Sequence, residues 1–275
     1  MRKALIVMRK DIRECFRDWQ VLTGFLVLPV ITSFVLPLII GFSCKAPAEE
    51  VRLPSKLEFM LEHGNISAIC RLLGVEGNLS INQVAAIYSV RSVLTPVLAL
   101  MPIFLPIVIA ADSFAGEKER KTLEPLLAAP ISDLELILGK VLASLVPSLI
   151  VSFASFAVAS LVVNLMLWDL FHCFFYPDAT SLTIMLFFSP AAALLSISVT
   201  VLVSSRVRGF REAQQLSALA LIPLVFFIFA SQIALLTILE PLTAVAFSLL
   251  LFSADVFLLY FSKEAFSREK IIERI

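Results

Sequence analysis

The charged residues with the most informative spacing lie in one segment, residues 112–140, between two long apolar runs. Thr122 is a good N-cap for a short helix over Leu123–Ala129, which Pro130 would stop. This helix and the residues before it would carry apolar and charged side chains together: Glu117, Glu119, Arg120, Thr122, Leu123, Glu124, Leu126 and Leu127. Such residues perform no covalent chemistry. They fit a docking surface for a protein partner, and an ordinary solvated loop fits them equally well.

No pattern in the sequence is typical of a catalytic, cofactor or metal site. His63 and His172 are isolated, and the four cysteines have no zinc-type spacing. Gly139-Lys140 lacks the earlier glycine and the following hydroxyl residue of a phosphate-binding loop. We therefore predict no enzymatic activity, no cofactor and no metal in this chain. Any ATP hydrolysis would belong to a separate subunit.

Asp255 is a candidate for a different chemistry, because it falls inside an apolar run near the end of the sequence. A carboxylate at the centre of a bilayer costs roughly 3 kcal/mol on insertion scales, so it should face protein or water. Asp255 could then bind a cation or take part in proton coupling. The more ordinary interpretation places it near the interface or pairs it with a neighbouring helix.

The apolar runs define the class of protein. Of the 275 residues, 59% are hydrophobic and 16% are charged. Several runs reach about 20 residues, the length that a helix needs to cross the hydrocarbon of a bilayer. The six predicted spans are Val21–Phe42, Val90–Ala111, Val141–Val163, Leu182–Val203, Leu216–Leu239 and Leu242–Phe261. We predict an all-α membrane protein with one domain over residues 1–275. A formal net charge of zero gives no indication of a nucleic-acid partner.

Proline is frequent inside these spans, and the second span alone holds Pro96, Pro102 and Pro106. Proline removes a backbone donor and kinks a helix, which membrane helices tolerate when neighbours satisfy the freed carbonyl. The second span is therefore expected to be bent or partly opened. It could line a pathway, or the bend could serve packing alone.

The distribution of lysine and arginine predicts the orientation. Basic residues are concentrated before the first span, between the second and third spans, between the fourth and fifth, and after the sixth. The loops around Phe171 and Glu240 have none. We expect both termini in the cytoplasm and the protein in the plasma membrane.

The first 20 residues are predicted to form an amphipathic helix that lies in the membrane interface, in contact with lipid. Its apolar face would hold Leu5, Met8, Ile12, Cys15, Phe16 and Trp19. Basic side chains such as Arg9 and Arg13 fall elsewhere around the helix. A further interpretation is that this helix braces a cytoplasmic partner.

Residues 43–89 are predicted to form an external loop. Within it, Pro54–Gly64 is expected to form a short helix. Ser80 and Gln83 have capping-box spacing, so the second membrane helix should begin well before Val90. Cys44 and Cys70 could form a disulfide, and two free thiols fit equally well.

Ser132 and Glu135 form a second capping box, which predicts that the helix of the third span begins here. The segment that leads to this point resembles the cytoplasmic loop of the ABC type-2 exporter permeases, particularly their sodium-extrusion and multidrug-like branch. The resemblance is carried by Glu117, Glu119, Arg120, Thr122, Leu123, Glu124, Leu126, Leu127, Pro130, Ser132, Gly139 and Lys140. Lys121 departs from the family pattern, which usually has glycine there. The Lys10–Glu14 segment and the six-span layout are also similar to this family.

The resemblance implies a function that residue patterns alone do not give. In this family the loop forms a coupling helix that docks on a separate ABC ATPase subunit, and a second permease copy or a paralogue completes the transporter. The chain would then be the permease of an ATP-driven exporter, with residues 112–140 as its coupling loop. Two alternatives remain open. One is a motor-independent channel or secondary transporter that uses Asp255, and the other is a membrane scaffold for a cytoplasmic enzyme.

Overall fold

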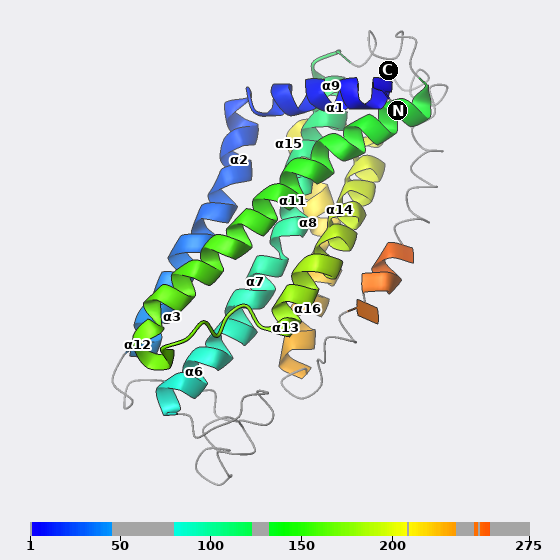
Figure 1. Cartoon of the computed structure of the whole chain (residues 1–275). Coiled ribbons are helices and arrows are strands. Elements are labelled where there is room, and N and C mark those ends of the chain that lie inside the picture. The colour runs from blue at the N-terminus through cyan, green and yellow to red at the C-terminus, as the bar shows by residue number, and fades with distance from the viewer. Residues whose placement is uncertain are drawn as a thin grey trace.

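The computed structural model describes residues 2–45, 80–122, 132–207, 209–234, 245–246 and 248–253, and every regular element in these ranges is a helix. Four of these helical stretches are long and apolar enough to cross a membrane: Val21–Lys45, Asn82–Glu119, Leu134–Met166 and Ala179–Ser204. They correspond to the first four predicted spans. Figure 1 shows them running along one another, with the N-terminal helix α1 (Arg2–Cys15) lying across one end. We call this end the α1 end.

The first two spans are each built from several helical pieces. The first contains α2 (Trp19–Val30), the π-helical turn η1 (Ile31–Val35) and α3 (Leu36–Lys45). The second contains α6 (Ile81–Ser89), η2 (Val90–Leu94), α7 (Thr95–Ala99), α8 (Met101–Ala111), η3 (Asp112–Gly116) and α9 (Glu117–Glu119).

Three π-helical turns among the described residues end two positions before a proline. Pro37 follows η1, Pro96 follows η2, and Pro190 follows η4 (Ile184–Phe188). A proline ring clashes with the carbonyl four residues earlier and has no N–H to donate. Widening the turn relieves this clash, because the residue before the proline then bonds five residues back. The turn η3 has no proline at this distance, so proline does not explain it.

The second span forms the centre of the bundle. In its most apolar stretch 78% of the residues are buried, against 39% in the corresponding stretches of the first and third spans. Its helix is interrupted at Leu100, between α7 and α8, as the prolines predicted. Pro96, Pro102 and Pro106 are all buried, which favours packing over a water-filled pathway as the reason for the bend.

The third span is a single helix, α11 (Asp133–Met166), with 34 residues. At 1.5 Å per residue it extends for about 51 Å, so it reaches from the α1 end to the opposite end of the bundle. It begins at the predicted capping box, where the amide of Glu135 donates to the hydroxyl of Ser132. It packs against α1, α8 and α14 (Ser189–Ser204), and so connects the outer and central helices.

The later helices are shorter. After α11 come α12 (Trp168–Phe171), α13 (Ala179–Thr183), η4 and α14. The fifth predicted span is divided at Leu221 into α15 (Phe210–Ala220) and α16 (Ile222–Ala234). Pro223 explains the break, because its ring would clash with the carbonyl of Leu219 in a continuous helix. The end of the fifth predicted span and most of the sixth lie outside the described residues, so the total of six stays a prediction.

The segment predicted to be an external loop is described only at its two ends. The capping box at Ser80 is present, since the amides of Ser80 and Gln83 each bond to the other residue's side chain. The helix that leads into the second span therefore begins at Ile81, well before Val90, as the capping box predicted. Cys44 is a buried free thiol. Cys70 and the predicted Pro54–Gly64 helix lie outside the described residues.

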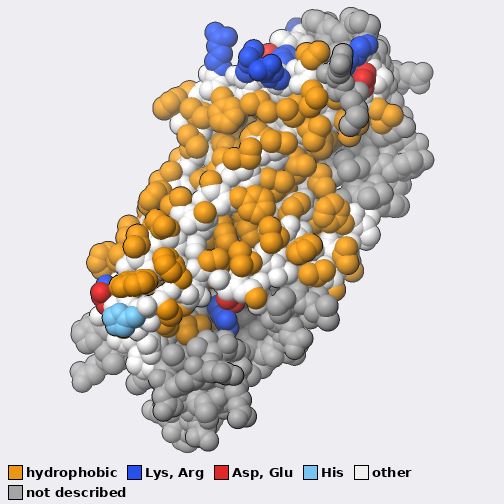
Figure 2. Space-filling model, viewed as in Figure 1, with side chains coloured by type: hydrophobic (Ala, Val, Ile, Leu, Met, Phe, Trp, Pro, Cys, Tyr) orange, Lys and Arg blue, Asp and Glu red, His pale blue; other side chains and the backbone are white. Residues whose placement is uncertain are grey.

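The outward surfaces of the helices are apolar. Figure 2 shows hydrophobic side chains over the middle of the bundle and charged side chains toward its two ends, with lysine and arginine more prominent near the α1 end. Large side chains such as Phe42, Ile150 and Leu165 are each more than 60% exposed. A continuous apolar surface of this kind fits contact with lipid chains.

Candidate functional site: a buried charge cluster at the α1 end

The inner face of α1 docks directly on α11. Ala4, Val7, Asp11 and Cys15 recur at helical spacing on this face, and all four are buried. Gly139 makes the close approach possible. A Cβ atom at this position would lie 2.7 Å from the carbonyl oxygen of Ala4 and 2.8 Å from Cβ of Val7.

This face differs from the predicted apolar face. Of the residues predicted to form one apolar face, Cys15 is buried, whereas Leu5, Phe16 and Trp19 are between 46% and 75% exposed. The segment formed by α1 and the residues up to Trp19 therefore has two apolar sides. One packs on the bundle and carries the buried Asp11, and the other is free to meet lipid.

Lys140 lies at the centre of the charge cluster, and its side chain is 1% exposed. Its Nζ donates to Oε2 of Glu117 at 2.6 Å and to the carbonyl oxygen of Ser113 at 2.5 Å. It also contacts Oγ of Ser113 at 3.1 Å and Oδ2 of Asp11 at 3.4 Å. The ammonium is therefore surrounded by acceptors from α1, η3 and α9. A buried charge is tolerated only when it is paired and hydrogen-bonded in this way.

Lys10 approaches the same carboxylates from the solvent side. Its Nζ lies 2.6 Å from Oε1 of Glu117, 3.3 Å from Glu14 and 3.6 Å from Oδ1 of Asp11. Burial alone would lower the pKa of Lys10, but the hydrogen bond to Glu117 and the nearby carboxylates outweigh it and raise the pKa. Glu117 is thus held between two ammonium groups, and the two buried carboxylates are balanced by two lysines.

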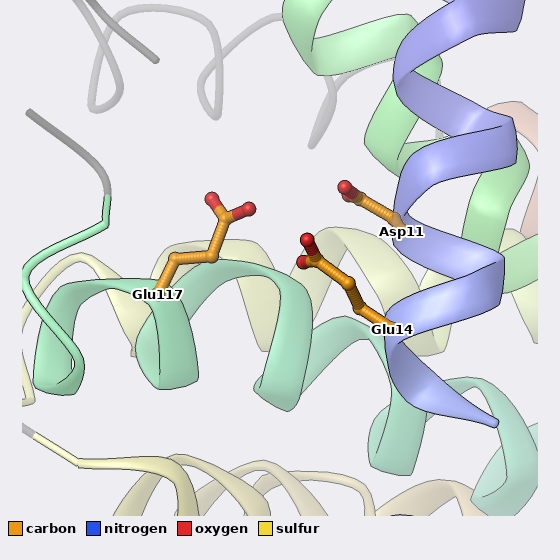
Figure 3. A group of neighbouring side chains, drawn as sticks. All are labelled: Asp11, Glu14 and Glu117. Atoms are coloured by element: carbon orange, nitrogen blue, oxygen red, sulfur yellow. The ribbon is translucent and has the colours of Figure 1, made fainter. Parts of the chain in front are cut away.

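Asp11, Glu14 and Glu117 point their carboxylates toward one another (Figure 3). One oxygen from each lies within 4.8 Å of the others, a grouping that could hold a cation. The two ammonium groups already supply positive charge at this place. The group therefore fits a protein salt-bridge network better than a metal site.

Asp112 forms a second branch of the cluster, on the adjacent turn. Its Oδ1 accepts a hydrogen bond from Nη2 of Arg120 at 2.7 Å, and its Oδ2 accepts one from the thiol of Cys15 at 3.6 Å. Arg120 also bonds to Oδ2 of Asp18 at 3.0 Å. Gly116 leaves room for this arrangement, because a Cβ there would lie 2.6 Å from Oδ1 of Asp112. The π-helical turn η3 therefore faces the cluster, as such turns often do at functional sites.

The second span ends in a Schellman motif. The amide of Thr122 donates to the carbonyl oxygen of Glu117 at 3.0 Å, and that of Lys121 donates to the carbonyl oxygen of Lys118 at 3.2 Å. The motif requires the first residue after the helix to be left-handed. Lys121 occupies this position and has a φ of 56°. Glycine adopts this conformation without strain, so the departure from the family pattern falls where glycine would be favoured.

The same end of the span is tied to the start of α15. Nζ of Lys118 donates to the carbonyl oxygen of Val207 at 3.1 Å. The amide of Phe210 donates to Oε2 of Glu119 at 2.9 Å, so Glu119 satisfies a free N–H in the first turn of α15. The charged end of the second span thus contacts α1, α11 and α15.

The predicted coupling residues are only partly described. Glu117 pairs with the buried Lys140, and Glu119 accepts a hydrogen bond from the first turn of α15. Arg120 pairs with two carboxylates, and the hydroxyl of Thr122 donates to the carbonyl oxygen of Glu117. Leu123, Glu124, Leu126, Leu127 and Asp255 lie outside the described residues.

Sequence reasoning missed the roles of Asp11 and Ser113. In the structure Ser113 Oγ donates a hydrogen bond to Oδ2 of Asp11 at 2.6 Å. The available signal was an acid on the same helix face as Ala4, Val7 and Cys15.

Comparison with known proteins identifies the family. The family described as "ABC-2 family transporter protein" matches residues 5–263, which is nearly the whole chain. This chain belongs to the ABC-2 transporter family. No curated protein matches the sequence. Membership agrees with the resemblance seen in residues 117–140 and extends it over the whole described bundle.

Membership in the ABC-2 family fixes the broad role of the chain. It is an integral membrane protein and the membrane permease of an ABC transporter, a transport component that is not itself catalytic. ABC-2 permeases work with ABC ATPase partners. The buried charge cluster therefore lies in the membrane component of a transporter.

Proposed function

We propose that this ABC-2 permease exports its substrate from the cytoplasm, with energy from a separate ATPase subunit that docks on the loop after Thr122. The observation that supports this proposal is the Glu117–Lys140 ion pair, in which Oε2 and Nζ are 2.6 Å apart. Glu117 precedes this loop and Lys140 follows it. A force on the loop would therefore reach the second and third spans together.

α1 takes part in the same transmission. Its Asp11 bonds to Ser113 and Lys140, and its Lys10 bonds to Glu117. α1 also lies across the bundle end, where an ATPase subunit would approach (Figure 1). In our proposal the ATPase moves α1 and both spans as one body. The α1 end is then cytoplasmic, as the excess of basic residues predicts, and the membrane is the plasma membrane.

We propose further that Glu124 and Leu127 make the main contacts with the ATPase, and that a second permease copy or a paralogue completes the transporter. The alternative of a channel that uses Asp255 has no support from the described residues, because Asp255 lies outside them. A scaffold for a cytoplasmic enzyme would use the same end of the molecule. The two ideas differ in whether the bound partner hydrolyses ATP.

The test is purification of the tagged permease from its native membranes in mild detergent, followed by mass spectrometry of the bound proteins. We expect an ATPase with a phosphate-binding loop, and we expect its loss when Glu124→Ala and Leu127→Ala are combined. Leu165→Ala is the matched control, because this exposed leucine lies far along α11 from the loop. A partner without ATPase activity, or an ATPase retained by the double variant, would contradict the proposal.

A further inference from the structure

A cavity of about 250 Å³ lies at the end of the bundle opposite α1, where α6 and α12 come together (Figure 1). It is independent of the charge cluster and of the proposed coupling to an ATPase. Its lining combines apolar side chains with a few polar ones: Gln83, Ile87, Val90, Arg91, Phe171, Cys173, Phe175, Tyr176 and Asp178. Small-molecule sites usually have this composition, with polar groups that fix the orientation of the ligand.

The apolar wall of the cavity is held in place by neighbouring polar contacts. The rings of Phe171 and Phe175 are stacked, with centroids 4.2 Å apart. Asn164 accepts hydrogen bonds from the amides of Phe175 and Tyr176, at 3.1 and 3.3 Å. The ring of Tyr176 is buried, and its hydroxyl lies 3.4 Å from that of Thr95. The wall is therefore formed before any ligand arrives, which lowers the entropic cost of binding.

The polar part of the lining is an ion pair. Nη2 of Arg91 lies 3.0 Å from Oδ2 of Asp178, and their side chains are 35% and 19% exposed. Asp178 is fixed by its role as the N-cap of α13, because Oδ1 accepts hydrogen bonds from the amide and hydroxyl of Ser181. A positive and a negative group thus lie side by side on the lining of an apolar cavity.

This arrangement selects one kind of ligand. Guanidinium groups bind carboxylates and phosphates through parallel hydrogen bonds. An ammonium group is attracted both to a carboxylate and to aromatic faces such as those of Phe171 and Phe175. A ligand with a single charge that drew Arg91 or Asp178 out of their ion pair would leave the other member without this partner. A zwitterion with an attached apolar group matches both charges and fills the apolar space.

We propose that this cavity binds a small amphipathic zwitterion, with its anionic group on Arg91 and its ammonium group beside Asp178. The volume is below the roughly 300–1,000 Å³ of sites for drug-sized ligands, so the ligand is small. Two sources carry this chemistry: a free apolar amino acid, and the head group of a zwitterionic phospholipid. The test below separates them.

Cys173 gives a direct readout, because it is an exposed free thiol in the lining of the cavity. Cys15 and Cys44 are buried, and a Cys70→Ser background removes the remaining thiol. The full chain would be purified in a maltoside detergent, and the rate of maleimide attachment at Cys173 would be followed by mass spectrometry. One arm adds L-phenylalanine, with phenylacetate and phenethylamine as ligands that each lack one charge. The other arm compares nanodiscs of phosphatidylethanolamine with nanodiscs of phosphatidylglycerol.

We expect a zwitterion at about ten times its Kd to slow the labelling of Cys173 about tenfold, because only about a tenth of the cavities stay empty. Protection by phenylalanine, but not by its singly charged analogues, identifies a free small zwitterion. Protection only in phosphatidylethanolamine discs identifies the lipid head group. Equal labelling rates under all these conditions would overturn the proposal.

Variants test whether the ion pair carries the effect. Arg91→Gln should abolish protection, whereas Lys45→Gln should preserve it, since the exposed Lys45–Asp169 pair does not line the cavity. If Arg91→Gln does not elute as a folded protein, Ile87→Phe is the second variant, because it fills the cavity and leaves both charges in place. Protection that survives in a folded Arg91→Gln or Ile87→Phe protein would also overturn the proposal.

Discussion

The two ends of the bundle hold their chain segments together by different means. At the α1 end, Lys140, Asp11 and Glu117 are almost fully buried and bond to one another across three helical segments. At the opposite end, the ion pairs Lys45–Asp169 and Arg91–Asp178 both reach solvent, and the fully buried contacts, such as that of Asn164 with the amide of Tyr176, are made by neutral groups. A buried charge is stable only while all its partners are in place, whereas neutral contacts can be lost one at a time. The α1 end should therefore respond as a unit, and the opposite end should respond locally.

Removal of one charge at each end should give the largest difference. Lys140→Met leaves Asp11 and Glu117 buried with less positive charge, and should lower the free energy of unfolding by about 3–5 kcal/mol. Lys45→Met removes a lysine that is 37% exposed, and should leave the unfolding midpoint nearly unchanged. Thermal unfolding of the detergent-solubilised proteins measures both. Equal shifts of the unfolding midpoint in the two variants would show that the two ends do not differ in this way.

A methyl group added at a helix contact should have a smaller effect. In Gly139→Ala the new Cβ meets the backbone of α1, and the variant should lose about 1–3 kcal/mol by overpacking. Gly41→Ala is the counterpart toward the other end, where the new Cβ would lie 2.8 Å from Cβ of Met166. Because a Cβ atom is fixed to its backbone, this variant should also lose stability by overpacking, but at the contact of α3 with α11 and not at α1. Alkylation of Cys15 should accelerate only in Gly139→Ala, since only this variant displaces α1.

The two described residues with positive φ that are not glycine lie one at each end. Lys121 has a φ of 56° and His172 a φ of 52°. A residue with a side chain is strained in the left-handed conformation by about 1–2 kcal/mol, and replacement by glycine removes this strain. Glycine also makes the unfolded chain more flexible, which lowers the free energy of unfolding by up to about 1 kcal/mol. Lys121→Gly and His172→Gly should therefore each raise the free energy of unfolding by about 0.5 kcal/mol. Destabilisation by either variant in thermal unfolding would show that its side chain makes a contact worth more than this strain.

The smallest expected effect is the response of Cys15 to pH. Burial, followed by the charges of Asp112 and Asp11, raises the pKa of this thiol. The pKa is therefore higher in the folded state than the value of about 8.5 for an unfolded thiol. The resulting stabilisation is complete below that value and decreases as the pH rises above it. Between pH 7 and pH 9 folded Cys15 should stay unlabelled by maleimide, with exposed Cys173 as the labelled reference. Rapid labelling of Cys15 at pH 9 would contradict the buried, protonated thiol.

Local sequence patterns predicted the helix starts well. The capping boxes at Ser80 and Ser132 both mark the first turn of a long helix. These signals work because a capping side chain bonds to an amide only three residues away. Three π-helical turns also end two positions before a proline, but Pro29 and Pro147 lie inside α-helices without such a turn, so proline alone does not predict one.

The charge cluster could not be predicted in the same way. Asp11 and Lys140 are 129 residues apart, and no local pattern records that they meet. On α1, Asp11 is surrounded in sequence by Lys10, Arg13 and Glu14, so it looked like part of a solvated polar face. The face that became buried was set by small residues and by Gly139 on another helix. Tertiary packing therefore decided which of two apolar sides of α1 would face the protein.

The separation of 129 residues between Asp11 and Lys140 also has a consequence for biogenesis. At synthesis rates of about 5–20 residues per second, Lys140 leaves the ribosome roughly 6–26 s after Asp11. During this interval Asp11 and, later, Glu117 have no buried ammonium from α11 to neutralise them. Docking of α1 on the bundle must therefore wait until the third span has been inserted. A chain truncated before Lys140 should leave α1 undocked and accessible to proteases and chaperones.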